Sequence, residues 1–185
     1  MEWTIPGTVL TGQRTDVEHS IRQIEGMFLG GGMIRSQLAS VTGVEAYDIQ
    51  NWVKRGFLPS PVNKRYSINQ FCRIVIINML RSAMPMEQIC SLLAWVNGRL
   101  DDTSDDLIDD RVLYFMFLRL AARARHIGGK DDWDTAIADI LKDYQEPIPG
   151  AKKRIDQVLR IMLTAWIGVR TIQKASRMLA QLQEG

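Results

Sequence analysis

Residues 34–56 carry two short helical patterns separated by one glycine, and this spacing restricts the folds that the chain can adopt. Ile34, Leu38 and Val41 fit one face of a first helix, and Gly43 interrupts the pattern. The second pattern has Val44, Ile49, Trp52 and Val53 on its inward side and Gly56 at its end. Two helices this short and this closely joined must cross tightly.

A tight crossing needs a small residue at the contact, and Ala39 is available there. Gly43, four residues later, tolerates the positive φ that the turn requires. The solvent face of the second helix would carry Tyr47, Gln50, Asn51 and Lys54. Gln and Asn can pair with adenine in the major groove, and Lys can contact a phosphate or guanine. The pattern indicates a helix-turn-helix, although plain helical hairpins show similar surfaces.

The segment after Gly56 favours DNA binding over a plain hairpin. Residues 57–66 contain two prolines and no helical pattern, so a loop or short hairpin is expected. Basic residues flank this segment in the runs Lys54-Arg55-Gly56 and Asn63-Lys64-Arg65-Tyr66. Such groups can contact phosphates and release counterions. We interpret Tyr66 as a core anchor beneath the loop.

Charge is unevenly distributed, although the net charge is only +2. The stretch from Met33 to Ser82 has two acidic residues, Glu45 and Asp48. Its basic residues are Arg35, Lys54, Arg55, Lys64, Arg65, Arg73 and Arg81. Residues 101–110 are strongly acidic and are expected to be a solvated connector, with Mg²⁺ binding by paired aspartates as the weaker alternative. A basic module joined to an acidic connector is therefore predicted.

The rest of the chain is predicted to be helical, with an N-terminal exception. Residues 1–14 show no periodicity and are expected to form an extended arm, followed by a helix from Asp16 to Phe28 and a flexible joint at residues 30–32. Ser67 and Gln70 form a capping-box pattern before a very apolar helix. No strand is predicted outside the loop after Gly56.

Three further helices are expected after the acidic segment, the last from about Ala151 to Leu182. The apolar residues of this last helix mostly follow three-four spacing. It can pair with its twin in a second copy or close a bundle with the two preceding helices. We expect a bundle that also supports dimerisation.

The sequence lacks the residue patterns that several classes of function require. Cys72 and Cys90 form no Cys-x-x-Cys pair and are interpreted as small core residues. His19 and His126 have no metal-ligand spacing, and no phosphate loop or nucleophile motif occurs. We therefore expect no enzyme activity, metal or cofactor. Without a long apolar run or a signal-peptide pattern, a cytoplasmic location with no membrane contact is expected.

The run from Ile34 to Pro59 resembles the MerR-type pattern of bacterial regulators. Arg65-Tyr66-Ser67 and the run from Met84 to Ile89 resemble the wing and the later helices of that fold. The phrases at residues 49–56 and 76–81 are similar to an uncharacterised family of low-GC Gram-positive bacteria, which has a MerR-like domain and a helical tail.

The resemblance implies an all-α fold in which a MerR-like winged helix-turn-helix precedes a C-terminal helical bundle. The expected parts are an N-terminal arm and helix at 1–32, the winged helix-turn-helix at 33–100, the acidic connector at 101–110 and the helical domain at 111–185. The candidate DNA-binding residues are Arg35, Ser36, Gln37, Tyr47, Gln50, Asn51, Lys54, Arg55, Lys64, Arg65 and Tyr66.

The chain departs from the MerR pattern in four respects. MerR regulators usually have Arg where Gln50 stands, and their basic wing is longer than residues 57–66. The paired cysteines of metal sensors are missing, and an acidic segment replaces the dimerising helix that follows the fourth helix. Promoter distortion, the family's way of activating transcription, is therefore not carried over to this chain.

The sequence favours a homodimeric transcription regulator that binds double-stranded DNA. The alternative is a protein-interaction module that keeps the MerR-like fold without binding DNA, which the short loop and near-neutral charge favour.

Overall fold

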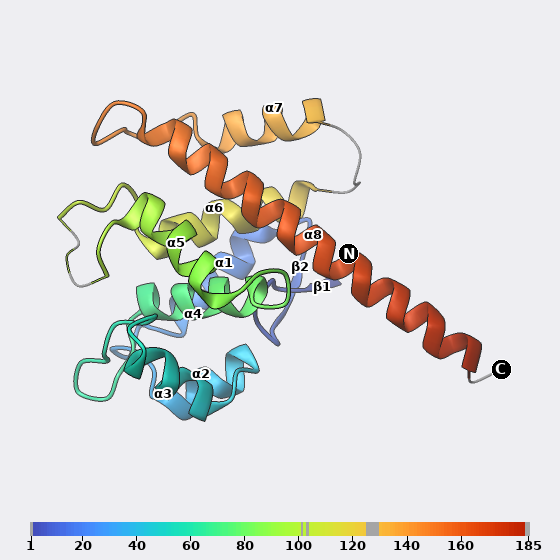
Figure 1. Ribbon diagram of the computed structural model, residues 1–185, viewed down its shortest axis with the longest axis horizontal. Coiled ribbons are helices and arrows are strands. Elements are labelled where there is room, and N and C mark those ends of the chain that lie inside the picture. Colours follow the sequence, from blue (N-terminus) through green and yellow to red (C-terminus); the bar gives the residue numbers. More distant parts are fainter. Residues whose placement is uncertain (1, 101, 103, 125–129, 184–185) are drawn as a thin grey trace.

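A computed structural model describes residues 2–100, 102, 104–124 and 130–183, which are mostly helical with one small sheet (Figure 1). The helices of these residues are α1 (Val17–Gly26), α2 (Arg35–Thr42), α3 (Ala46–Lys54), α4 (Ile68–Leu80), α5 (Met86–Asn97), α6 (Asp110–Arg123), α7 (Lys130–Ile140) and α8 (Ala151–Gln183). The strands β1 (Glu2–Thr4) and β2 (Thr11–Gln13) pair antiparallel. Asp101 and His126 lie outside the described residues.

The β1–β2 hairpin corrects the prediction of an extended arm without strands. Trp3 and Ile5 are buried while Thr4 between them is exposed, which is the alternation of a strand. Each strand has only three residues, too few for this alternation to stand out in the sequence. The Tyr114 hydroxyl donates a 2.6 Å hydrogen bond to the Pro6 carbonyl, which fixes the hairpin to the core.

Helix α4, whose sequence is very apolar, lies at the centre of the core. Its residues from Phe71 to Ile77 are all buried, and α6, α8, α2 and α5 pack around it. The capping box is confirmed, because Ser67 Oγ accepts from the Gln70 N–H at 3.2 Å and Gln70 Oε1 accepts from the Ser67 N–H at 2.8 Å. This cap fixes the point at which the chain leaves the loop before α4.

Helices α2 and α3 form a packed pair at the lower edge of the molecule in Figure 1. Gly43 joins them with φ of 70°, which confirms the predicted left-handed turn residue, and its N–H donates to the Ala39 carbonyl at 2.9 Å. Leu38 and Ile49 are fully buried and Trp52 is 6% exposed. These three side chains anchor both helices to the core.

The acidic segment is more structural than the expected solvated connector. Asp110 begins α6, and its carboxylate receives Arg73 Nη1 at 3.2 Å and Asn97 Nδ2 at 2.8 Å. Arg73 also donates through Nε to the Phe57 carbonyl at 2.9 Å and is only 6% exposed. Arg73 therefore belongs to a buried ion pair and adds nothing to the basic surface. This ion pair could not be predicted from the sequence, because Arg73 and Asp110 are 37 residues apart.

One continuous core joins β1 to α8, and it includes Ile108 from the segment before α6. Cys72 is buried in it, and Cys90 is half-buried. The first half of α8 packs on α5 and α6, with Phe117 and Trp166 in edge-to-face contact. Beyond Val169, every described side chain of α8 is exposed, and the helix projects from the body (Figure 1). None of the described helices combines the length and apolar character needed to cross a membrane.

Candidate nucleic-acid interface

The outer face of α3 presents the polar residues that the sequence placed there. Tyr47 is 72% exposed, Lys54 is exposed, and Gln50 and Asn51 are half-buried. The inner face is fixed by Ile49 and Trp52, so the polar side chains stand on a rigid support. Side chains held in this way can reach a ligand without a large loss of backbone freedom.

The N-terminus of α2 lies beside this face. Arg35 Nη1 donates a 2.8 Å hydrogen bond to Gln50 Oε1, which holds a guanidinium beside the polar face of α3. Ser36 is exposed in the first turn. Gln37 has a local structural role, because its Oε1 accepts from the Ile34 N–H at 3.0 Å and caps the helix. The sequence did not show the contact between Arg35 and Gln50.

The loop before α4 contains a two-residue hairpin turn, which confirms the prediction of a loop or short hairpin. The backbones of Val62 and Arg65 exchange hydrogen bonds of 3.1 and 2.9 Å. Between them, Asn63 and Lys64 have φ of 49° and 62°, as a type I′ turn requires. Asn tolerates this conformation well, whereas Lys is strained in it. Lys64 therefore projects from the tip of the hairpin at a cost in stability.

A buried tyrosine and a glycine fix the base of this hairpin. Tyr66 is 4% exposed, and its backbone exchanges hydrogen bonds of 2.8 and 3.0 Å with Met33. Burial raises the pKa of the Tyr66 hydroxyl, and Arg35 nearby opposes that rise. Arg65 Nη1 donates to the Gly32 carbonyl at 2.9 Å, and a Cβ on Gly32 would lie 2.7 Å from the Tyr66 carbonyl oxygen. Gly32 is thus held against the hairpin base, and Tyr66 serves as the anchor.

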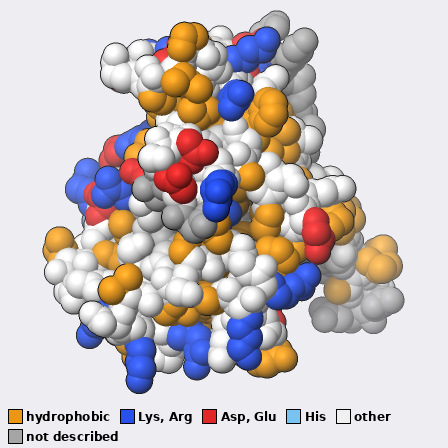
Figure 2. Space-filling view, turned by 60° about the vertical axis from the view of Figure 1, so that its left-hand side comes forward, with side chains coloured by type: hydrophobic (Ala, Val, Ile, Leu, Met, Phe, Trp, Pro, Cys, Tyr) orange, Lys and Arg blue, Asp and Glu red, His pale blue; other side chains and the backbone are white. Residues whose placement is uncertain are grey.

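The basic residues around this face differ in what they contact. Arg55 lies 3.4 Å from Glu87 and 4.5 Å from the Phe57 ring centroid, and Arg81 pairs with Asp48 at 3.3 Å. Among the described residues, Lys54 and Lys64 have no ion-pair partner. Figure 2 shows Lys and Arg side chains gathered along the lower edge, over α2, α3 and the hairpin. The arrangement is a rigid polar helix face bordered by positive charge.

Other chemistry is not visible in the described part of the chain. There, no group of three or more His, Cys, Asp or Glu side chains is placed to hold a metal ion. Burial raises the pKa of Asp106 to about 6, and the charges of Asp110, Asp105 and Asp109 add to this rise. This perturbation lies in the segment between α5 and α6.

Comparison with known proteins identifies relatives whose function is not described. Residues 34–117, under half of the chain, match the family model described as a domain of unknown function (DUF1836). The chain is 33% identical over 81 residues to the uncharacterized protein YkrK of Bacillus subtilis (strain 168). That match covers 42% of this chain and 35% of YkrK. No solved structure matches the chain. The family match runs from α2 into the first part of α6 and so includes the α3 face, the hairpin and the Arg73–Asp110 pair.

Proposed function

We propose that the chain is a DNA-binding transcription regulator in which α3 enters the major groove and the hairpin at residues 62–65 contacts flanking phosphates. In this proposal α2 and α3 form a helix-turn-helix and the hairpin is a short wing, as in MerR-like proteins. The observation that carries it is the pair Lys54 and Lys64, which are exposed and without ion-pair partners among the described residues, one in the last turn of α3 and the other at the hairpin tip.

Base recognition would come from Gln50 and Asn51. Arg35 holds Gln50 Oε1, so the amide group of Gln50 is oriented before DNA arrives. An oriented Gln or Asn amide can donate to N7 and accept from N6 of adenine. Tyr47, at the outer edge of α3, is exposed enough to contact the sugar-phosphate backbone.

Phosphate contact would come from Lys64 and Lys54, which stand at the hairpin tip and at the last turn of α3. Lys64 occupies a backbone conformation in which Gly is usual. Strained residues of this kind gather at functional sites, where a side chain is needed despite its cost. In this proposal, the positive charge that Lys64 brings to phosphate offsets the backbone strain at the hairpin tip.

The rival function is a protein-interaction module with a MerR-like fold. One observation favours it: the arginines around the α3 face already have internal partners. Arg55 pairs with Glu87, Arg81 with Asp48, and Arg65 bonds to a backbone carbonyl. Fewer cations are then free for phosphates than the sequence suggested.

The test is binding of the purified protein to pooled genomic duplexes, measured by fluorescence anisotropy at 50 and 200 mM salt. DNA binding predicts a complex at low salt that weakens at high salt, and its loss in Lys64→Glu/Arg65→Glu. The matched control is Arg22→Glu/Lys153→Glu, which makes the same charge change at exposed sites on α1 and α8. Absence of binding, or equal binding by both double variants, would favour the interaction module.

A further inference from the structure

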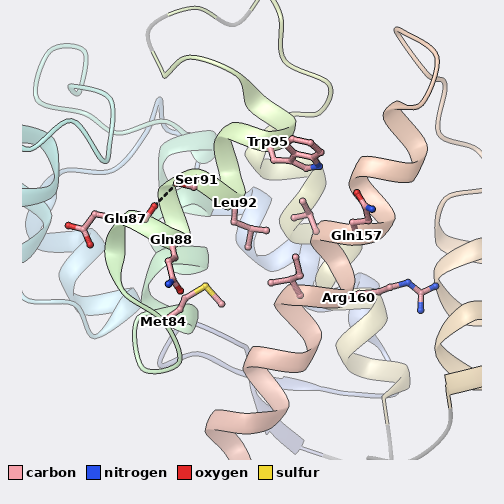
Figure 3. Close-up of a pocket in the computed structure, with 10 residues that line it drawn as sticks. Met84, Glu87, Gln88, Ser91, Leu92, Trp95, Gln157 and Arg160 are labelled. Carbon is pink, nitrogen blue, oxygen red and sulfur yellow. Dashed lines mark hydrogen bonds between the residues drawn. The ribbon is translucent and has the colours of Figure 1, made fainter.

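An open apolar groove lies between α5 and α8, with a volume of about 820 Å³. Its apolar walls are Met84, Leu92 and Trp95 on one side and Val158 and Ile161 on the other. Figure 3 shows Leu92 and Trp95 pointing from α5 toward α8, while Arg160 points away from the groove. Arg160 is held by Asp134 and Asp156 at 2.6 and 2.9 Å. Trp95 remains 52% exposed, although Arg154 lies 4.8 Å from its ring centroid.

The projecting end of α8 carries a second apolar surface. Alternating steps of four and three residues connect Ile161, Ala165, Gly168, Ile172, Ala175, Leu179 and Leu182. This spacing places them on one stripe of the helix, which begins at the groove and continues to the free end. Ile172, Leu179 and Leu182 are 66, 58 and 80% exposed. A Cβ added to Gly168 would meet no atom within 4 Å, so the stripe faces open space there.

The groove and the stripe account for much of the apolar surface that the protein exposes. Twelve large hydrophobic side chains are exposed among the described residues, and five of them belong to these two surfaces. The five are Trp95, Ile161, Ile172, Leu179 and Leu182. A helix end as short as residues 170–183 draws little stability from its own hydrogen bonds in water and needs a packed apolar face. Exposed apolar patches of this kind mark interaction sites.

We propose that a second copy of this chain covers both surfaces: the α8 end of each copy lies in the α5–α8 groove of its partner. The arrangement is reciprocal, so a two-fold axis relates the copies and closes the assembly as a dimer. The two α8 helices run antiparallel and cross near Gly168. Ala165 and Gly168 are small, and they allow the helix axes to approach closely at that point.

The lengths of the two segments agree with this crossing. Leu179 lies eleven residues after Gly168, and the groove residue Gln157 lies eleven residues before it. Both separations are about 17 Å at 1.5 Å per helical residue. Leu179 of one copy therefore reaches the level of Gln157 in its partner, and Leu182 reaches the level of Arg154 and Trp95. The exposed end of one helix thus has the length needed to fill the groove of the other.

The dimer contact involves only the α5–α8 surfaces and does not depend on DNA binding. The contact is apolar, so raising the salt concentration should leave the dimer intact, whereas it weakens binding to phosphates. The two proposals can therefore fail separately.

Analytical ultracentrifugation of the full chain tests the contact with variants on each surface. Wild type should sediment as a dimer at micromolar concentration in both 50 and 500 mM salt. Leu182→Lys on the stripe and Trp95→Glu in the groove should each weaken the dimer at least about tenfold, because each places a charge in an apolar contact. Leu29→Lys is the matched control, since Leu29 is exposed but lies on neither surface, and it should remain dimeric.

Mixing the two variants distinguishes a reciprocal contact from simple pairing of the α8 ends. An equimolar mixture of Leu182→Lys and Trp95→Glu has one native contact and one Lys–Glu contact in each mixed dimer, so dimerisation should return. A monomeric wild type would overturn the proposal. So would a Trp95→Glu variant that dimerises normally, because the stripe would then pair with its twin without the groove. Circular dichroism of each variant confirms that a lost dimer is not a lost fold.

Discussion

Replacing Lys64 with glycine should stabilise the fold and weaken DNA binding together. Lys64 has φ of 62°, and the left-handed conformation costs an L-residue about 1–2 kcal/mol. Glycine removes that cost. It also increases the conformational entropy of the unfolded state, which lowers the free energy of unfolding by about 0.4–1 kcal/mol. The net gain should be about 1 kcal/mol, or a rise in Tm of roughly 2–4 °C for a protein of this size.

The loss in DNA binding follows from one lost phosphate contact. The logarithm of the binding constant changes by about 0.9 per phosphate for each tenfold change in salt. At 0.1 M salt, loss of the Lys64 contact should therefore weaken binding about eightfold for each copy that contacts DNA. The slope against salt should also become smaller by about 1 for each such contact.

Asn63→Gly is the matched control, since Asn63 shares the turn and has φ of 49° but carries no charge. Asn tolerates the left-handed region, so this variant should change both Tm and affinity little. Thermal unfolding and fluorescence anisotropy on the same samples measure the two effects. If Lys64→Gly bound DNA with unchanged affinity and salt slope, the hairpin tip would not contact phosphate. If its Tm fell, the proposed strain at Lys64 would be wrong.

Three further changes test the fold. Gly7→Ala should destabilise the protein by about 1–3 kcal/mol in urea unfolding, because Gly7 has φ of 76° and the new Cβ would overlap the Val75 carbonyl. An unchanged urea midpoint would refute the docking of the β1–β2 hairpin on α4. Arg73→Met should lower the free energy of unfolding by about 3–5 kcal/mol, because it leaves the Asp110 carboxylate buried without its cation. The double variant Arg73→Met/Asp110→Leu should recover part of that loss. An Arg73→Met variant with unchanged stability would contradict the buried pair. The folded-state pKa of Asp106, about 6, lies above the ordinary 3.8, so the folded state binds more protons and stability falls as pH rises from about 4 to 6. Asp106→Asn should remove this pH dependence, so the variant should be more stable than wild type at pH 7 but not at pH 4. The difference at pH 7 should be no more than about 1 kcal/mol, because the side chain is partly solvated. Equal differences in stability at both pH values would contradict the raised pKa of Asp106.

Local patterns made much of the helical architecture predictable. The turn at Gly43, the Ser67–Gln70 cap and the extent of α8 depend on residues that are neighbours in the chain. The exposed positions of Tyr47 and Lys54 followed from helical spacing in the same way. These features require only the geometry of a single helix or turn.

Contacts between distant segments were not predictable from such patterns. The β1–β2 hairpin depends on docking against α4 and α6, where Tyr114 bonds to the Pro6 carbonyl 108 residues away. By residue type, Arg73 belongs with the surface cations, but the structure buries it beside Asp110. Of the candidate site residues, Tyr66 is buried, and Arg55 and Arg65 have internal partners. Residue type alone cannot show which cations remain free for a ligand.

The salt dependence of DNA binding tests the proposed function most directly. Wild-type protein should bind genomic duplexes with a linear fall of log binding constant against log salt, at about 0.9 for each phosphate contacted. Lys64→Ala and Lys54→Ala should each lower that slope by about 1 per copy bound, while Lys153→Ala on α8 should leave it unchanged. No detectable binding at 50 mM salt, or a slope that neither Lys54 nor Lys64 affects, would contradict DNA recognition by this face.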